Sequence, residues 1–240
     1  MSNNYFQFKQ FTVEQERCAM KVCTDACLFG AYIAGSIEEG KLTSTNILDI
    51  GTGTGLLSLM LAQKTPAIID AAEIDKAAYY QARENFEESP WKERLNIFHA
   101  DIVQFDPGKK YDCIISNPPF FEKDLKSDDS KKNAAKHDSA LTLQQLLEVV
   151  IKYLEKDGVF AVLLPYHRIN YFTEEAEKVG LYLSKKVLVK QTPLHAWFRG
   201  MLFFSRRQTI STKEEISIRD KMGDYTNKFI DLLQDYYLYL

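Results

Sequence analysis

Residues 46–55 read Asn-Ile-Leu-Asp-Ile-Gly-Thr-Gly-Thr-Gly, and the apolar run Leu56 to Ala62 follows them. The apolar residues before the glycines predict a short buried strand, and the run after them predicts a helix. Glycines between two such elements let the backbone turn tightly and approach a ligand, while the start of the helix offers free N–H groups. This stretch therefore predicts an α/β fold in which the first strand of the sheet leads into a ligand-binding loop.

The spacing of the glycines narrows the kind of ligand that this loop binds. A dinucleotide-binding loop needs a glycine at position 56, where this chain has Leu56. Asp49 precedes the loop, and its carboxylate would repel a pyrophosphate but attract a cationic amino acid. The sequence therefore favours S-adenosylmethionine over NAD as the cofactor. The loop residues that we expect to bind it are Asp49, Gly51, Gly53 and Gly55.

Two further acidic residues follow the next two predicted strands. Glu73 ends the apolar segment 68–72, and Asp101 closely follows the segment 95–99. The carboxyl ends of neighbouring parallel strands meet at one edge of a sheet, where ligands bind. Glu73 is therefore placed to accept hydrogen bonds from the ribose hydroxyls of the cofactor, and Asp101 from its adenine amine. Ile74 and Ile102, which follow these acids directly, complete the predicted cofactor site.

A second motif, Ile-Ile-Ser-Asn-Pro-Pro-Phe at residues 114–120, indicates the reaction. The side-chain oxygen of Asn117 and the carbonyl of Pro118 can each accept one hydrogen of an exocyclic amine, which directs the nitrogen lone pair toward a methyl donor. Pro119 stiffens the turn, and Phe120 offers a flat face on which a base can stack. The motif predicts methyl transfer to an amine such as that of adenine, with Asn117, Pro118 and Phe120 as catalytic residues. Asn117 also counts among the residues expected to contact the cofactor.

The remaining pattern predicts the rest of the sheet. The segments 181–189 and 201–205 read as strands, and the link between them is too short for a crossover helix, so they should pair antiparallel. Helices are expected at 141–154, 168–179 and 222–238, and a strand at 158–165. The expected α/β fold is a doubly wound, Rossmann-like sheet, mainly parallel with a C-terminal antiparallel hairpin, and it is similar to class I methyltransferases. The charged stretch 121–139 is a candidate substrate lid.

Composition indicates where the protein acts and which partners it can bind. With 240 residues the chain suits one α/β domain, and its net charge is only −3. It has neither an apolar run of membrane-spanning length nor a signal-peptide core, so we expect a cytoplasmic protein. Its four cysteines form no metal-type pattern with histidine, and no metal is expected. Any RNA contact must come from local patches. The expected substrate-binding residues are Pro119, Phe120, Phe121, Lys185, Lys186, Lys190 and Arg199.

Several segments resemble one family, the bacterial tRNA adenine-N(6) methyltransferases that modify the adenine at position 37, beside the anticodon of valine tRNA. The similarity covers nearly the whole chain. The segments that carry it read Arg-Cys-Ala-Met-Lys-Val at 17–22, Thr-Asp at 24–25, Gly-Ala-Tyr at 30–32, Ala-Arg-Glu-Asn at 82–85 and Ser-Pro-Trp at 89–91. Ala26 and the pair Lys136-His137 depart from the usual pattern of the family.

The resemblance implies a single methyltransferase domain over residues 1–240, with an N-terminal cap extension at 1–45. In this family the N-terminal stretch covers the methionine end of the cofactor, which implies that Lys21, Thr24 and Asp25 line that site. The implied partner is the anticodon loop of a tRNA, bound by a monomer or a weak dimer.

The proline-rich turn by itself leaves other acceptors open. Related chains with the same turn methylate glutamine side chains of release factors, whose amide nitrogen also has a delocalised lone pair, and another RNA base is a further alternative. Such protein-modifying enzymes usually carry a helical substrate domain before the catalytic one, whereas only about forty-five residues precede the first predicted strand here. A third alternative is a non-catalytic RNA-binding assembly factor, which the intact Asn117 and cofactor loop disfavour.

Overall fold

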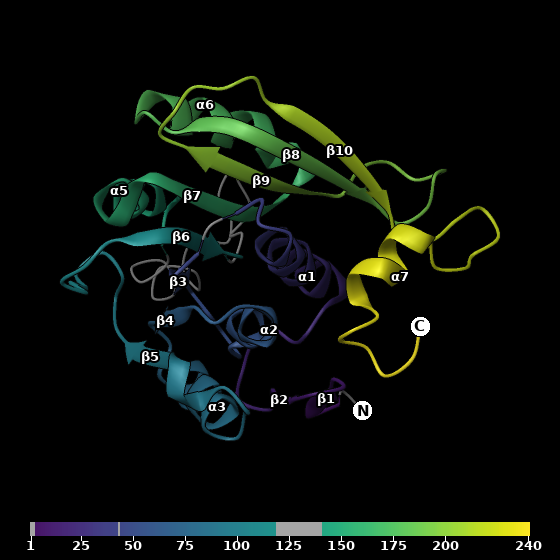
Figure 1. Cartoon of the computed structure of the whole chain (residues 1–240), viewed down its shortest axis with the longest axis horizontal. Coiled ribbons are helices and arrows are strands. Elements are labelled where there is room, and N and C mark those ends of the chain that lie inside the picture. The colour runs from purple at the N-terminus through teal and green to yellow at the C-terminus, as the bar shows by residue number, and fades with distance from the viewer. Residues whose placement is uncertain (1–2, 43, 119–140) are drawn as a thin grey trace, which may run out of the picture.

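A mostly parallel sheet forms the centre of the molecule (Figure 1). The structure, a computed structural model, describes residues 3–42, 44–118 and 141–240. Within these ranges the sheet has eight strands in the order β10-β8-β9-β7-β6-β3-β4-β5. They are β3 (Asn46–Ile50), β4 (Ile68–Glu73), β5 (Leu95–His99), β6 (Tyr111–Ser116), β7 (Leu154–Pro165), β8 (Tyr182–Lys190), β9 (Arg199–Ser205) and β10 (Thr212–Ser217).

The direction of the strands determines where the loops gather. The strands β3 to β7 are mutually parallel, so their carboxyl ends meet at one edge, the carboxyl edge of the sheet. β9 runs antiparallel to both β7 and β8, and β10 lies parallel to β8. The predicted doubly wound sheet, mainly parallel with an antiparallel pair of β8 and β9, is confirmed.

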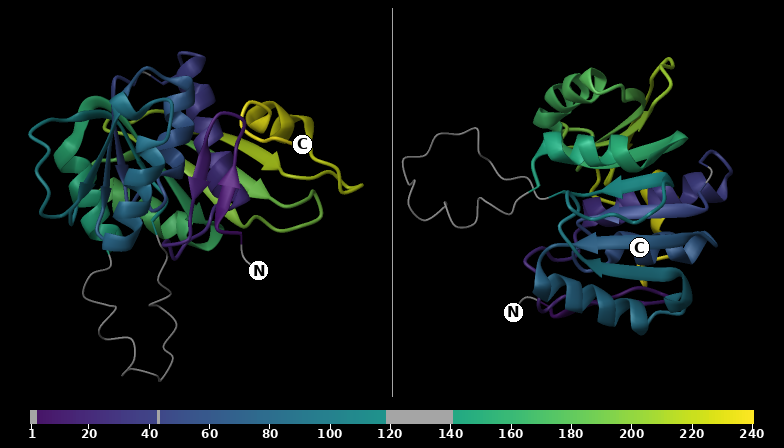
Figure 2. Two further views of the ribbon diagram at one scale, coloured as in Figure 1. Left: turned by 90° about the horizontal axis from the view of Figure 1, so that it is seen from below. Right: turned by 90° about the vertical axis from the view of Figure 1, so that its left-hand side faces the viewer.

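Helices cover both faces of the sheet (Figures 1 and 2). The helices α1 (Thr24–Glu38), α2 (Leu56–Lys64) and α3 (Lys76–Glu87) lie on one face, and α5 (Leu143–Tyr153) and α6 (Ile169–Lys178) on the other. Strand side chains alternate between two apolar cores: Ile115 packs with residues of α1 and α2, whereas Ile114 packs with residues of α5. None of the helices in the described ranges is long and apolar enough to cross a membrane.

The C-terminal part of the chain differs from the expectation. The helix expected over 222–238 is wrong in extent, because only α7 (Asn227–Leu233) forms. Before it, the carboxylate of Asp220 accepts N–H groups of three following residues and Gly223 has a φ of +97°, which folds this segment into a turn. The strand β10 was not predicted, because its sequence Thr-Lys-Glu-Glu-Ile-Ser is mostly polar and it pairs along only one side.

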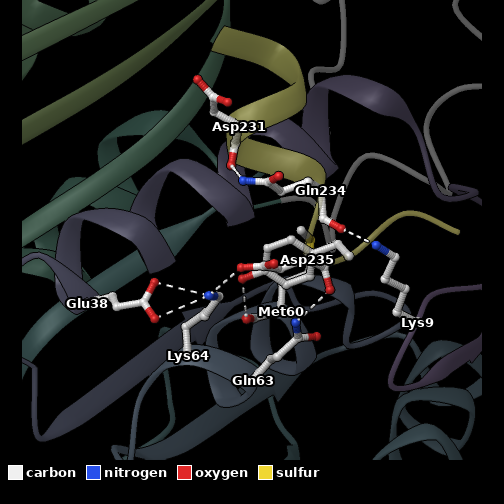
Figure 3. Close-up of polar contacts among 9 residues, drawn as sticks. Lys9, Glu38, Met60, Gln63, Lys64, Asp231, Gln234 and Asp235 are labelled. Atoms are coloured by element: carbon white, nitrogen blue, oxygen red, sulfur yellow. Dashed lines mark hydrogen bonds and ion pairs between the residues drawn. The ribbon is translucent and has the colours of Figure 1, made fainter. Parts of the chain in front are cut away.

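The two ends of the chain meet beside α2 (Figure 3). A short hairpin of β1 (Tyr5–Gln7) and β2 (Thr12–Glu14), also not predicted, places Lys9 at its turn. Lys9 donates from Nζ to the carbonyl of Gln234 at 2.6 Å, and from its backbone N–H to that of Tyr236 at 2.8 Å. Asp235 forms an ion pair with Lys64 of α2 at 2.6 Å. These contacts join the N-terminal hairpin to the C-terminal segment, and the C-terminal segment to α2.

Candidate active site

The glycine loop turns from β3 into α2 through left-handed backbone at three positions. The φ angle is +70° at Gly51, +58° at Gly53 and +82° at Gly55, a region that favours glycine. A Cβ at Gly51 or Gly53 would meet no atom within 4 Å, whereas one at Gly55 would lie 2.5 Å from Cε1 of Phe86. Gly51 and Gly53 therefore leave the backbone open to a ligand, while Gly55 allows the close packing of α3 against the loop.

Alanine at Gly53 or at Gly55 should separate these two roles. Both changes place a side chain at positive φ, which costs about 1–2 kcal/mol of folding free energy. Gly55→Ala adds a clash with Phe86 and should lose roughly 1–3 kcal/mol more. Gly53→Ala should instead weaken cofactor binding, because its methyl group projects into the open side of the loop. Urea denaturation measures the first effect and calorimetric titration with S-adenosylmethionine the second. Equal losses of stability in the two variants would contradict the assignment.

Asp49 lies near the end of β3, fully buried beneath the loop. Its Oδ2 accepts hydrogen bonds from the hydroxyls of Thr52 at 2.6 Å and Ser58 at 2.7 Å. Its Oδ1 is buried without a hydrogen-bond partner among the described residues. Burial raises the pKa of the Asp49 carboxyl to about 6, although the two hydroxyls favour the ionised form. A cationic group in the loop would compensate the buried charge and bond the free oxygen, so the residues present fit the amino-acid end of S-adenosylmethionine.

The raised pKa of Asp49 predicts a pH dependence of cofactor binding. A bound cation favours the ionised carboxylate and lowers its pKa, so binding should release a proton near pH 6. Cofactor affinity should therefore fall as the pH drops through about 6 and be constant well above it. The cofactor-free protein should show the opposite trend, because burial penalises only the ionised form: its stability should rise as the pH falls from about 6 toward the ordinary value of 3.8.

Calorimetry in buffers of different ionisation enthalpy measures the released proton. The variant Asp49→Asn, which cannot ionise, is the matched control and should release none at this site. A wild-type affinity that does not change between pH 5 and pH 8, roughly one unit below and two above the pKa, would contradict the role of Asp49.

Glu73 lies at the end of β4, and the structure brings it to the glycine loop. Its Oε2 accepts the N–H of Gly53 at 2.9 Å, and its Oε1 accepts the N–H of Asp75 at 2.8 Å. The carboxylate is thereby held in place, with a second lone pair left on each oxygen. Ile74 follows with a 45% exposed side chain, so an apolar surface stands beside the carboxylate. This pairing suits the ribose and the adenine of a nucleoside.

A backbone hydrogen bond between neighbouring strands brings Asp101 near Glu73. The N–H of Ala100 donates to the carbonyl of Glu73 at 3.0 Å, which fixes the end of β5 beside the end of β4. The Asp101 carboxylate accepts the N–H of Val103 at 3.0 Å and the amide of Gln104 at 3.2 Å. Asp101 therefore caps a local turn, and its expected bond to the adenine amine remains a prediction. Ile102 is buried against the core on the α5 side.

Asn85, a buried residue of α3, joins the N-terminal segment to the glycine loop. Its Nδ2 donates to the carbonyls of Thr54 at 2.8 Å and Glu14 at 2.9 Å, and its Oδ1 accepts the N–H of Glu14 at 2.9 Å. One turn earlier, the side chain of Gln81 accepts the N–H of Arg17 at 3.4 Å. This bridging role of Asn85 was not predicted from the sequence. The available signal was the presence of two amide side chains four residues apart on the buried face of a helix.

The N-terminal residues expected to line the cofactor site lie at the start of α1. Lys21 donates to the carbonyl of Gln15, and Thr24 is the first residue of the helix. Asp25 forms an ion pair with Arg199 at 2.6 Å. Burial on its own would raise the pKa of Asp25, but the thiol of Cys23 and the guanidinium of Arg199 outweigh it and keep that pKa below its usual value. Asp25 thus holds a residue of β9, and its contact with the cofactor remains a prediction.

Asn117 follows β6 directly at the carboxyl edge. The neighbouring Ser116 donates its hydroxyl hydrogen to the carbonyl of Ile50 at 2.9 Å, which ties the end of β6 to the start of the glycine loop. Side chains alternate between the two faces of a strand, and Ile115 faces α1 and α2. Asn117, two residues later, continues on that same face. It is half-buried, and Pro118 is buried. The expected roles of Pro119, Phe120 and Phe121 and the candidate lid at 121–139 lie outside the described residues.

The three lysines of β8 do not form one patch. Lys190 is the last residue of the strand and lies at the carboxyl edge, whereas Lys185 and Lys186 lie within it. Lys185 donates to Glu214 at 2.9 Å and to the hydroxyl of Tyr32 at 3.2 Å. Partial burial on its own would raise the pKa of Glu214, but its hydrogen bonds with Lys185, Lys228 and Tyr32 lower that pKa to about 2. The placement of Lys185 gives no support to an RNA contact.

Within the described ranges, no group of three or more His, Cys, Asp or Glu side chains could hold a metal ion.

Comparison with known proteins agrees with the fold. A family model described as the methyltransferase small domain matches residues 34–173. The chain is 42% identical to the tRNA1(Val) (adenine(37)-N6)-methyltransferase of Dyadobacter fermentans, with 98% of each chain covered. It is 41% identical to the protein of the same name from Trichodesmium erythraeum, with 99% of each covered.

Solved structures share the fold at low identity. The 16S rRNA N2 G1207 methyltransferase of T. thermophilus, in complex with AdoMet and guanosine, superposes with a TM-score of 0.60 at 20% identity, covering 85% of this chain and 50% of that one. A predicted O-methyltransferase of Agrobacterium tumefaciens gives a TM-score of 0.65 at 14% identity, covering 88% and 96%.

Fold, glycine loop and family model together define a class I, S-adenosylmethionine-dependent methyltransferase. The chain belongs, more narrowly, to the family of the tRNA1(Val) (adenine(37)-N6)-methyltransferases, and the resemblance seen in the sequence is confirmed.

Proposed function

We propose that this enzyme transfers the methyl group of S-adenosylmethionine to the exocyclic N6 amine of adenine 37 in a valine tRNA. The names of its relatives support the substrate. The observation that carries the reaction type is the position of Asn117, which the Ser116–Ile50 hydrogen bond fixes beside the glycine loop. An amide oxygen and a backbone carbonyl at this place match the two hydrogens of an aromatic amine.

The residues of the chain have separate tasks in this reaction. Bound S-adenosylmethionine supplies a methyl group that its sulfonium charge already activates. Asn117 and the carbonyl of Pro118 would accept the amine hydrogens and so orient the nucleophile, while Asp49 and Glu73, which bond the glycine loop, would hold the cofactor. Alignment of the two reactants is the main contribution, and the amine proton can leave to water after transfer. No general base is assigned.

We also propose how the target adenine is reached and in which compartment the enzyme acts. The target adenine lies in the single-stranded anticodon loop, where swinging a base out of its stack costs little compared with a duplex. We place the reaction in the cytoplasm, with the enzyme acting as a monomer or weak dimer. The four cysteines, Cys18, Cys23, Cys27 and Cys113, are free thiols, as a reducing compartment requires.

Methylation of purified transcripts tests this proposal. A valine tRNA transcript with adenine at position 37 should become labelled from tritiated S-adenosylmethionine, and nuclease digestion should yield N6-methyladenosine. A transcript with guanine at that position is the matched control and should remain unlabelled. Labelling of a glutamine-containing release-factor peptide, or equal labelling of both transcripts, would overturn the proposal in favour of the alternatives.

A further inference from the structure

The carboxyl edge of the sheet is divided by charge. On the side of β4 and β5, the segments 73–76 and 99–106 contain four carboxylates and a single lysine. On the side of β7, β8 and β9, the segments 166–168 and 190–199 contain one lysine, two arginines and two histidines but no carboxylate. We call residues 166–168 and 190–199 the basic rim. A polyanion that approaches this edge is attracted to one half and repelled by the other.

The two segments of the basic rim form one surface. The N–H of Tyr166 donates to the carbonyl of Phe198 at 3.0 Å, and the N–H of Phe198 donates to the carbonyl of Val189 at 3.0 Å. Because Pro165 of β7 pairs with Arg199 of β9, both segments leave the sheet at the same level. β7 is also the direct neighbour of β6, so the rim begins one strand away from the turn at Asn117. In Figure 2 the β8–β9 connection extends beyond the body of the sheet.

The rim is ordered by its own contacts and presents aromatic groups together with cations. The hydroxyl of Thr192 lies 2.7 Å from Nδ1 of His195, and the N–H of His195 donates to the carbonyl of Thr192 at 3.1 Å. The ammonium of Lys190 lies 4.4 Å from the ring centre of Trp197. Tyr166 adds an aromatic side chain that is 45% exposed. Aromatic faces beside cations are the combination that binds single-stranded nucleic acid.

The charges of the rim are not equivalent. Asp25 on α1 neutralises Arg199 at 2.6 Å, so this arginine contributes little net charge. Lys190 has the aromatic face of Trp197 as its neighbour, which leaves its charge available to an anion. The ammonium of a second lysine, Lys213, lies 6.0 Å from the centre of the same ring, although Glu215 pairs with it at 2.7 Å. Lys190 and Trp197 are therefore the residues on which a test should centre.

We infer that the RNA backbone flanking the target adenine lies along the basic rim, with its phosphates at Lys190 and a base or sugar against Trp197. This inference rests on the proposed function and adds to it the path that the RNA takes across the enzyme. The RNA crosses the β7–β8–β9 half of the carboxyl edge, while the acidic β4–β5 half is left to the cofactor. Phosphates supply most of the affinity in such complexes, and they act without reading the sequence. The rim thus fixes the substrate, and the Asn117 turn selects the base.

Trp197 provides a direct optical test, because the chain contains only two tryptophans. The other, Trp91, packs against Phe11 and can be replaced by phenylalanine. In the Trp91→Phe variant, titration with the valine tRNA transcript should change the fluorescence of Trp197 saturably, and added salt should reverse the change. Poly-glutamate of equal charge should have no such effect. An unchanged emission at tRNA concentrations that saturate methylation, or an equal response to poly-glutamate, would overturn the inference.

Charge reversal at Lys190 gives an independent measurement. Lys190→Glu should raise the KM for tRNA roughly tenfold and reduce the slope of log affinity against log salt by about 0.7, leaving kcat and cofactor affinity unchanged. Lys156→Glu is the matched control, since Lys156 is an exposed lysine near the amino end of β7. Equal KM values in the two variants would overturn the inference while wild-type methylation still supported the proposed function. If the wild type methylated no tRNA, the proposed function would fail, and the fluorescence titration would still report whether the rim binds RNA.

Discussion

The variant Asn117→Ala should lose turnover by at least about 100-fold while its affinity for S-adenosylmethionine stays within about twofold of wild type. The reason is the division of tasks at the carboxyl edge. Asn117 follows β6 and is proposed to bind the acceptor, whereas the carboxylates of Asp49 and Glu73 bond residues of the glycine loop, the proposed cofactor site. A tritium-methyl assay with the valine tRNA transcript measures turnover, and calorimetric titration measures cofactor affinity.

Two further variants make the Asn117 experiment specific. Asn170→Ala removes the same side chain from an exposed position of α6 and should retain full activity. Asn117→Gln keeps the amide but displaces it by one methylene group, so it should recover little of the loss if alignment is the essential contribution. Wild-type turnover in Asn117→Ala would remove this residue from the mechanism. A parallel loss of cofactor affinity would instead assign it to the cofactor site.

Glu73→Ala should weaken cofactor binding roughly ten- to hundred-fold, with part of the activity restored at high cofactor concentration. A buried carboxylate bonded to hydroxyl groups contributes on the order of 1.5–3 kcal/mol. The structure adds a second cause, since the same carboxylate holds the N–H of Gly53 at 2.9 Å and so shapes the loop. Calorimetry with S-adenosylmethionine and a cofactor-dependent rate curve measure both effects.

The two causes can be separated with Glu73→Gln. Its amide oxygen can still accept the N–H of Gly53 and so shape the loop, but its NH2 group cannot accept the N–H of Asp75. Stability should therefore fall by only about 1 kcal/mol, while affinity remains reduced because the side chain carries no charge. Glu87→Ala, an exposed change on α3, is the control and should leave affinity unchanged. A Glu73→Ala affinity within a factor of two of wild type would exclude the ribose contact. NAD should cause no thermal shift in the wild type, in agreement with Leu56 at the position where a dinucleotide loop has glycine.

The sequence predicted those parts of the molecule that depend on local pattern. The segment 46–62 encodes a strand, a glycine loop and a helix in adjacent residues, and the structure contains each of them. The antiparallel pairing of β8 and β9 followed from the short link between them. Asp49 of β3 and Glu73 of β4 both bond the glycine loop, because parallel strands end at one edge of the sheet.

Long-range pairings could not be predicted in this way. The ion pair of Asp25 with Arg199 joins residues 174 positions apart, and the bridge from Asn85 to Glu14 spans 71 positions. Neither pairing leaves a periodic pattern in the chain. Lys185 was expected at an RNA surface because it belongs to a cluster of cations near the last strands, yet Glu214 and Tyr32 bind it within the fold. Charge in a sequence thus predicts a surface less well than glycine predicts a loop.

The contact between the two ends of the chain sets an order of assembly during synthesis. Lys9 bonds Gln234 across 225 positions, and Phe8 pairs with Tyr237. The N-terminal hairpin therefore cannot complete its packing until the ribosome has made these late residues, and closure over such a separation is slow. The last residue of this hairpin, Glu14, is the one that Asn85 joins to the glycine loop. The nascent enzyme should thus complete this hairpin, and the brace that it gives the glycine loop, only after residues 234–237 have been made.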